Sequence, residues 1–99
     1  MSLTQLYDFH GKIALITGAS GGLGEQFARC LHARGARVLL ASRREDKLKN
    51  LSDELGNAKA IKMDVADKNS VISCFSELEV TGEKIDICIN NAGIAKLTP

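Results

Sequence analysis

Short apolar runs alternate with amphipathic segments along the whole chain, and this alternation constrains the fold more than any other feature. The apolar runs are KIALIT (12–17), ARVLLAS (36–42), AKAIKMDV (58–65) and a fourth within KIDICINNAG (84–93). Short runs of this kind, separated by helical segments, are typical of a parallel sheet that helices cover on both faces. The sequence therefore predicts an α/β fold.

Between these runs, apolar residues recur at the spacing of one helix face. The three sets are Leu23, Phe27 and Leu31 within 22–35, Leu48, Leu51 and Leu55 within 44–56, and Val71, Phe75 and Leu78 within 67–78. Asp67 is placed to cap the third helix, and Gly35 and Gly56 follow the first two. Because parallel crossovers are right-handed, this βαβαβαβ order predicts a Rossmann-like, doubly wound sheet with strand order 3-2-1-4.

The first apolar run passes directly into a glycine-rich segment, TGASGGLG (17–24). Glycine weakens strands and helices alike, so this segment is expected to need a bare backbone. Gly18 would permit a tight turn, Gly22 would let a pyrophosphate approach the backbone, and Gly24 would let the helix pack closely on the sheet. Ser20 would donate its hydroxyl to a phosphate or ribose oxygen, and the helix N-terminus would favour the anion. A flexible turn with surplus glycine is the alternative interpretation.

Composition excludes several classes of function. The net charge of +1, with one Tyr, three Phe and no Trp, gives no support for nucleic-acid binding. No apolar run approaches the roughly 18 residues of a membrane span, and the glycine segment lacks the G-K-S/T ending of an ATPase P-loop. The three widely spaced cysteines, Cys30, Cys74 and Cys88, predict no metal site and no disulfide. We expect buried, reduced thiols and a cytoplasmic protein.

Three motifs at predicted strand ends resemble those of the short-chain dehydrogenase/reductase family. Its single-domain branch carries T-G-x-x-x-G-x-G after the first strand and N-N-A-G after the fourth. TGASGGLG (17–24) and NNAG (90–93) match these patterns, and Asp64-Val65 matches the Asp that follows the third strand. The resemblance extends from about residue 10 to the end of the chain.

The resemblance implies that these strand ends bind a dinucleotide. The residues concerned are Gly18, Ser20, Gly21 and Leu23 for the diphosphate and ribose, Asp64 for the adenine amino group with Val65 against the ring, and Asn90, Ala92 and Gly93 beside the ribose and nicotinamide. It also implies that Thr17 ties the glycine turn to Asn90 and Asn91. On the residues alone, Asp64 as a cap or loop carboxylate, and the two asparagines as a turn capping their strand, are alternatives.

The end of the second predicted strand indicates which dinucleotide is bound. An NAD enzyme places an Asp or Glu there on the ribose 2′-hydroxyl, whereas this chain has Ala41 or Ser42 at that position, followed by Arg43 and Arg44. Arginine binds phosphate through charge-assisted hydrogen bonds. The sequence therefore predicts NADP(H) rather than NAD(H), with Arg43 on the 2′-phosphate and Ser42 assisting. Two solvated arginines at a helix start are the alternative.

No catalytic residue can be assigned. The family uses a Ser and a Y-x-x-x-K pair, but the only tyrosine is Tyr7, which has no Lys four residues on. We therefore expect residues 1–99 to be the N-terminal dinucleotide-binding part of a single Rossmann-like domain in a longer enzyme.

The resemblance implies an oxidoreductase that interconverts an alcohol and a carbonyl on a small molecule, as a homo-oligomer at full length, and the arginines after the second strand make NADP(H) its expected cofactor. A non-catalytic dinucleotide-binding module and a structural remnant without a ligand are the alternatives.

Overall fold

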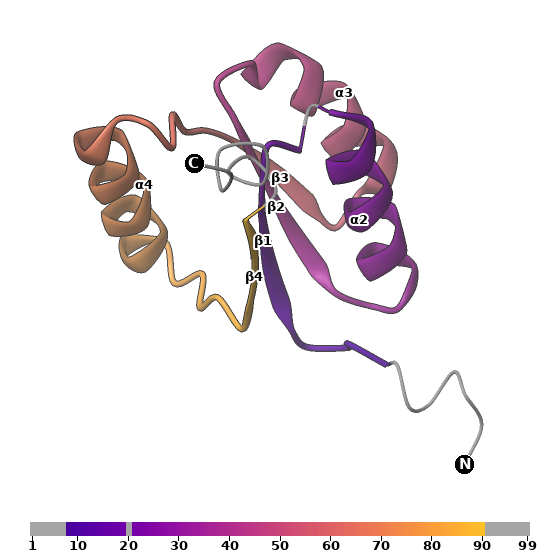
Figure 1. Cartoon of the computed structure of the whole chain (residues 1–99). Coiled ribbons are helices and arrows are strands. Elements are labelled where there is room, and N and C mark those ends of the chain that lie inside the picture. The colour runs from indigo at the N-terminus through magenta and orange to yellow at the C-terminus, as the bar shows by residue number, and fades with distance from the viewer. Residues whose placement is uncertain (1–7, 20, 91–99) are drawn as a thin grey trace, which may run out of the picture.

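The computed structural model describes residues 8–19 and 21–90, which form a four-stranded parallel sheet between helices (Figure 1). The strands are β1 (Ile13–Thr17), β2 (Arg37–Ser42), β3 (Ala58–Lys62) and β4 (Ile87–Asn90), and the helices are α2 (Gly22–Ala33), α3 (Glu45–Leu55) and α4 (Lys68–Val80). The strand order β3-β2-β1-β4 confirms the predicted Rossmann-like fold. All the predicted elements are present, and their ends differ from expectation by a few residues.

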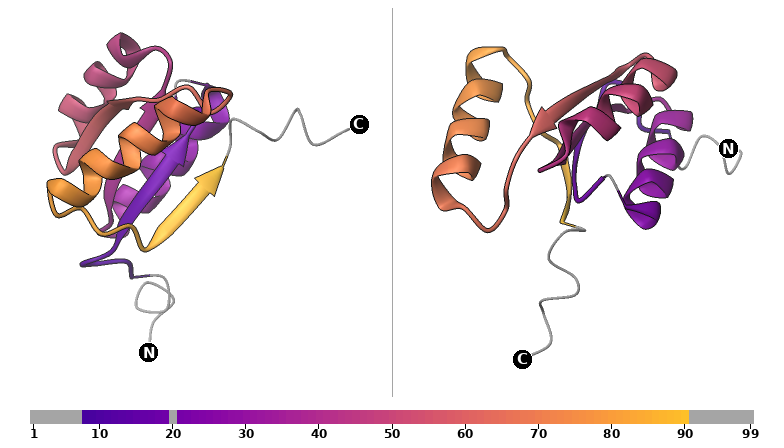
Figure 2. Two further views of the ribbon diagram at one scale, coloured as in Figure 1. Left: turned by 90° about the vertical axis from the view of Figure 1, so that its left-hand side faces the viewer. Right: turned by 90° about the horizontal axis from the view of Figure 1, so that it is seen from above.

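Helices cover both faces of the sheet, as the apolar strands require. Helices α2 and α3 lie on one face and α4 lies on the other (Figure 2). Successive strand residues alternate between the two faces. Ile16 and Leu40 pack in the cluster beneath α2 and α3, whereas Leu15 and Leu39 pack in the cluster beneath α4. The central strands β1 and β2 are thus buried on both sides, and the edge strands carry the exposed residues.

Two residues predicted on buried helix faces are largely exposed. Leu23 is 51% exposed because it lies in the first turn of α2, where β1 has already ended. Phe75 is 42% exposed. The face that α4 turns to the core instead comprises Cys74 and Leu78, with Val71 packed against them. The spacing of these three residues marks the inward face more closely than the predicted set did.

The prediction of buried thiols is correct only for Cys74. Cys30 and Cys88 are exposed, and all three cysteines are free. Cys88 pairs in register with the buried Leu15, but it lies on the edge strand β4, which α4 leaves open in Figure 2. Burial raises the pKa of the Cys74 thiol, which therefore stays protonated and acts as a small apolar side chain.

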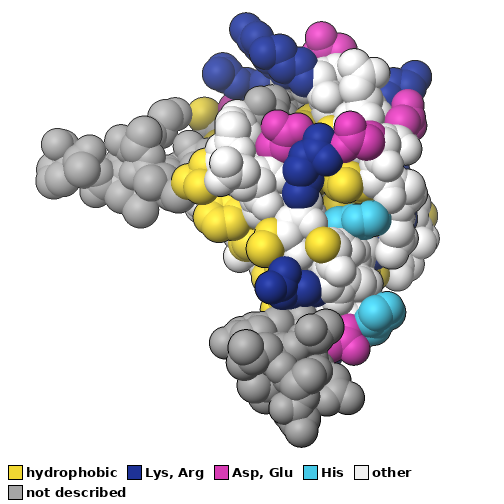
Figure 3. All heavy atoms as spheres, turned by 90° about the vertical axis from the view of Figure 1, so that its right-hand side faces the viewer, with side chains coloured by type: hydrophobic (Ala, Val, Ile, Leu, Met, Phe, Trp, Pro, Cys, Tyr) yellow, Lys and Arg dark blue, Asp and Glu magenta, His cyan; other side chains and the backbone are white. Residues whose placement is uncertain are grey.

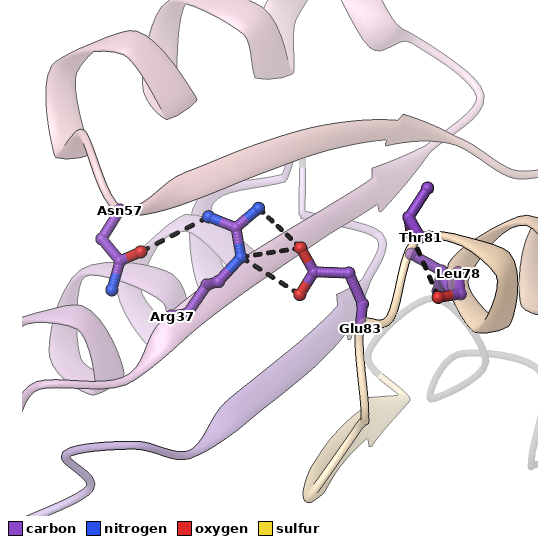
Figure 4. A network of polar contacts seen from close by, with 5 residues as sticks. All are labelled: Arg37, Asn57, Leu78, Thr81 and Glu83. Carbon is purple, nitrogen blue, oxygen red and sulfur yellow. Dashed lines mark hydrogen bonds and ion pairs between the residues drawn. The ribbon is translucent and has the colours of Figure 1, made fainter.

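A polar network fastens the edge of the sheet opposite the glycine turn (Figure 4). The Arg37 Nε donates to the two Glu83 carboxylate oxygens at 2.9 and 3.1 Å, and Nη1 donates to Asn57 Oδ1 at 3.3 Å. The start of β2 is thereby joined to the segments that precede β3 and β4. Nearby, the Ile13 N–H donates to the Asp86 carboxylate at 2.9 Å. These contacts position β4, which pairs only with β1 in the described sheet.

Arg37→Met is expected to lower the free energy of unfolding by about 1–3 kcal/mol, because it leaves the Glu83 carboxylate without its charged partner. The Glu83 side chain is only 15% exposed, so water restores little of the lost interaction. Urea unfolding of both proteins measures the difference. Arg29→Met is the control, since the ion pairs of Arg29 with Glu25 and Glu54 lie in solvent, and its effect is expected to be much smaller. Equal losses from both variants would contradict the role of the network.

Candidate functional site

The carboxyl ends of the strands meet at one edge of the sheet, at the top of Figure 1, and the glycine turn lies there. The Gly21 N–H donates to the Gly18 carbonyl at 3.2 Å and closes the turn. The Ala19 N–H donates to the Ala41 carbonyl at 3.2 Å, so the turn is also fixed to the end of β2. Gly18 has a φ of +64°, a backbone conformation that strains residues with a Cβ atom.

Among the described residues, no side chain caps the first turn of α2. Its N-cap is Gly21, which makes no side-chain cap hydrogen bond, and a Cβ atom on Gly22 would meet nothing within 4 Å. By contrast, Asp67 caps α4 by accepting from the N–H groups of Asn69 and Ser70. The N-terminus of α4 is thus satisfied by its own carboxylate, whereas no described side chain does this for α2.

Gly24 differs from Gly21 and Gly22 in being buried, as is Ala28 on the same helix. Both residues lie on the face of α2 that contacts β1 and β2. Small residues at these positions let the helix axis lie near the sheet. Gly21 and Gly22 are exposed at the carboxyl edge. Within one motif, Gly24 therefore packs the helix on the sheet, while Gly21 and Gly22 leave the backbone of the turn accessible from solvent.

Thr17 joins the end of β1 to the end of β4. Its hydroxyl donates to Asn90 Oδ1 at 3.0 Å and lies 3.4 Å from the Ile89 carbonyl. Thr17 and Asn90 are partners in the strand register, and the Thr17 side chain is buried. The tie between the glycine turn and the first residue of the NNAG motif is therefore present, and it orients the Asn90 amide at the carboxyl edge.

The end of β2 presents one buried hydroxyl and two exposed cations. Ser42 is 8% exposed, and its Oγ accepts the Arg44 N–H at 3.1 Å, which fixes the passage from β2 into α3. The Arg43 and Arg44 side chains are exposed, and neither forms an ion pair with a side chain that the structure describes. The position therefore offers cationic groups that are available to an anionic ligand.

Asp64 holds the loop that follows β3. Its carboxylate accepts the Ala66 N–H at 3.0 Å, and its own N–H donates to Ser70 Oγ at 3.0 Å. The loop-carboxylate interpretation of Asp64 is thus observed, while the cap is Asp67. Val65 beside it is 39% exposed at the carboxyl edge, which leaves an apolar surface next to the half-buried Asp64.

The structure brings the predicted residues of four strand ends to one edge of the sheet. These are Gly18, Gly21, Gly22, Leu23, Gly24, Ser42, Arg43, Asp64, Val65 and Asn90. Ser20, Asn91, Ala92 and Gly93 lie outside the described residues.

A recess of about 240 Å³ lies beside these strand ends, on the α4 face of the sheet. Its lining includes Phe75 and Cys88, which the sequence analysis did not assign to the site, together with Thr17 and Asn90. No sequence motif marks this recess, because it depends on β4 lying at the edge of the sheet.

A model of the short-chain dehydrogenase family matches residues 12–99. The chain belongs to this family. Its three strand-end motifs, TGASGGLG (17–24), Asp64-Val65 and NNAG (90–93), all lie within the matched residues. Within residues 8–19 and 21–90, no helix combines the length and apolar character needed to cross a membrane.

Curated relatives support the assignment. The chain is 44% identical over 89 residues to the 3-oxoacyl-(acyl-carrier-protein) reductase FabG of Salmonella typhimurium, covering 89% of this chain and 36% of the relative. It is 36% identical over 95 residues to dehydrogenase/reductase SDR family member 11 of Gallus gallus, covering 90% of this chain and 37% of the relative. The chain thus spans little more than a third of the length of these short-chain dehydrogenases.

Solved structures show the same arrangement. A putative gluconate dehydrogenase from Agrobacterium tumefaciens superposes with a TM-score of 0.82 at 34% identity, over 86% of this chain and 35% of that one. A short-chain type dehydrogenase/reductase from Mycobacterium marinum superposes with a TM-score of 0.79 at 36% identity, over 89% of this chain and 37% of that one. Both superpositions cover most of this chain.

Proposed function

We propose that this chain is the dinucleotide-binding part of an NADP(H)-dependent oxidoreductase that interconverts an alcohol and a carbonyl. The observation that carries the proposal is the first turn of α2, which no described side chain caps and which lies at the carboxyl edge between the ends of β2 and β4. Parallel α/β sheets bind their ligands at this edge, where the strand order reverses. Membership in the short-chain dehydrogenase family supports the same function.

The strand order suggests how the dinucleotide lies across the edge. Its diphosphate would sit against the first turn of α2 and contact Gly18, Ser20, Gly21 and Leu23. Strands β2 and β3 lie on one side of β1 and β4 lies on the other. The adenosine half would therefore lie towards Asp64 and Val65, and the nicotinamide half towards Asn90, Ala92 and Gly93. When bound, the nicotinamide supplies the hydride chemistry.

The end of β2 supports NADP(H) over NAD(H). The last residue of β2 is Ser42 rather than an Asp or Glu. A carboxylate at this position would bind a ribose 2′-hydroxyl and repel a 2′-phosphate. Arg43 is exposed at the next position and would bind the 2′-phosphate. The Ser42 hydroxyl, which already orients the Arg44 backbone, would assist from the same turn.

The catalytic groups of the reaction are proposed to lie elsewhere in the protein, because this sequence contains no Y-x-x-x-K. The full protein would act on a small molecule, as the name of the putative gluconate dehydrogenase suggests, whereas the name of the reductase gives a substrate carried on acyl-carrier protein. We also propose that the full protein is a homo-oligomer and that it is cytoplasmic. Its three free thiols are in keeping with a reducing compartment. The second candidate is a dinucleotide-binding module without catalysis, which the same first turn of α2 would serve equally well.

Fluorescence titration of the purified protein with NADPH and with NADH tests the proposal. The two ligands differ only in the 2′-phosphate, so each serves as the control for the other. NADPH is expected to bind at least about tenfold more tightly, since one charge-assisted contact is worth about 1.5–3 kcal/mol. Equal affinities would overturn the cofactor preference, and binding of neither would overturn the dinucleotide site. Turnover of simple alcohols or ketones would separate the enzyme from the non-catalytic module.

A further inference from the structure

The last residue of β3 lies beside the end of β2. Lys62 is the register partner of Ser42, and the Met63 N–H donates to the Ser42 carbonyl at 3.0 Å, which continues the pairing past the strand. Because neighbouring parallel strands are about 4.8 Å apart, the two backbones are adjacent at this point. Lys62 is thus next to the predicted 2′-phosphate position, although the sequence separates it widely from Arg43.

The side chain of Lys62 lies on the same face of the sheet as that of Ser42. Ala58 and Ala60 on β3 pack against the cluster beneath α2 and α3, as does Leu40 on β2. Every second side chain of a strand points to the same face, so Lys62 shares the face of Ala58 and Ala60, and Ser42 shares the face of Leu40. Lys62 is exposed there and forms no ion pair with any described side chain.

Cations outnumber carboxylates around this corner of the sheet. The exposed cations at the end of β2, the start of α3 and the end of β3 are Arg43, Arg44, Lys47 and Lys62. The described carboxylates nearest to these cations in the chain are those of Asp46 and Asp64, and the sequence adds Glu45. Figure 3 shows Lys and Arg side chains at the upper end of this face, where the strands end, with Asp and Glu side chains among them. Such a corner lowers the free energy of a bound dianion.

We propose that Lys62 is a second cationic residue for the 2′-phosphate of the dinucleotide, acting beside Arg43. This inference rests on the proposed NADP(H) preference and extends it to β3. A 2′-phosphate carries more negative charge than one guanidinium neutralises, and the flexible lysine stem spans the distance between adjacent strands. Arg43 approaches the phosphate from the β2–α3 turn, whereas Lys62 approaches it from the neighbouring strand.

The test compares Lys62→Gln with Lys59→Gln in the complete native chain. Lys59 lies on the same strand, three residues earlier, on the opposite face, near Cys74. The probes are 2′,5′-ADP and 5′-AMP, which differ only in the 2′-phosphate and need no substrate or turnover. Lys62→Gln is expected to weaken 2′,5′-ADP binding about fivefold and to leave 5′-AMP binding unchanged. Lys59→Gln should change neither, and Lys62→Arg should retain tight 2′,5′-ADP binding.

Three outcomes would overturn the inference, and they are distinguishable. If Lys62→Gln leaves 2′,5′-ADP binding intact while Arg43→Ala weakens it, the proposed NADP(H) site stands and the role of Lys62 falls. If Lys62→Gln weakens both probes equally, the residue supports the fold of the site rather than the phosphate. If the unmodified protein does not prefer 2′,5′-ADP over 5′-AMP, the cofactor preference and the role of Lys62 fall together.

Discussion

Gly22→Ala is expected to weaken NADPH binding about 100-fold without loss of stability. The added methyl group would stand in front of the α2 N–H groups and keep the diphosphate from them, removing contacts worth about 3 kcal/mol. The folded protein has room for the methyl, since a Cβ atom on Gly22 meets nothing within 4 Å. Alanine also favours a helix, so the free energy of unfolding should stay the same or rise by up to about 0.5 kcal/mol.

The measurement is a fluorescence titration with NADPH, run beside urea unfolding of the same two proteins. Gln26→Ala provides the matched control, because it places the same residue on the same helix one turn further from the open edge. This control should leave the NADPH affinity unchanged. Tight binding by Gly22→Ala would show that the diphosphate does not lie against the first turn of α2, and the proposed site would have to be abandoned.

Arg43→Ala is expected to raise the NADPH dissociation constant about 30-fold and to leave the NADH dissociation constant unchanged. The guanidinium contributes charge-assisted hydrogen bonds to the 2′-phosphate, worth about 2 kcal/mol, and NADH has no group in that place. Because the Arg43 side chain is exposed and unpaired among the described side chains, its loss should not disturb the fold. The effect should shrink as salt is added, since ions screen an exposed contact.

Arg44→Ala is the neighbouring control for this prediction. Arg44 contributes its backbone N–H to the Ser42 hydroxyl, and alanine retains that group. A smaller loss of NADPH affinity is therefore expected from Arg44→Ala than from Arg43→Ala. Ser42→Asp should weaken NADPH binding, because its carboxylate would repel the 2′-phosphate, and should strengthen NADH binding, because it would accept a hydrogen bond from the ribose 2′-hydroxyl. Equal effects of Arg43→Ala on NADPH and NADH would contradict the assignment of Arg43.

The strand ends of the site could be predicted because their signals are local in sequence. The glycines of TGASGGLG indicate a turn between a strand and a helix, and the apolar runs indicate a sheet buried on both faces. Strand order followed from the handedness of the crossovers, which is nearly invariant. The exposed side chains of Leu23 and Phe75 were mispredicted because helical spacing indicates a face, not how far the sheet extends beneath it.

The sequence by itself determined the order of strands and helices, the glycine turn, and the absence of a carboxylate at the end of β2. Each of these depends on residues that are near one another in the chain. Only the tertiary structure decided which distant residues meet: Thr17 with Asn90, Arg37 with Glu83, and Lys62 with Ser42. Strand register and edge position set these contacts, and both arise from packing the whole sheet, which no local pattern encodes.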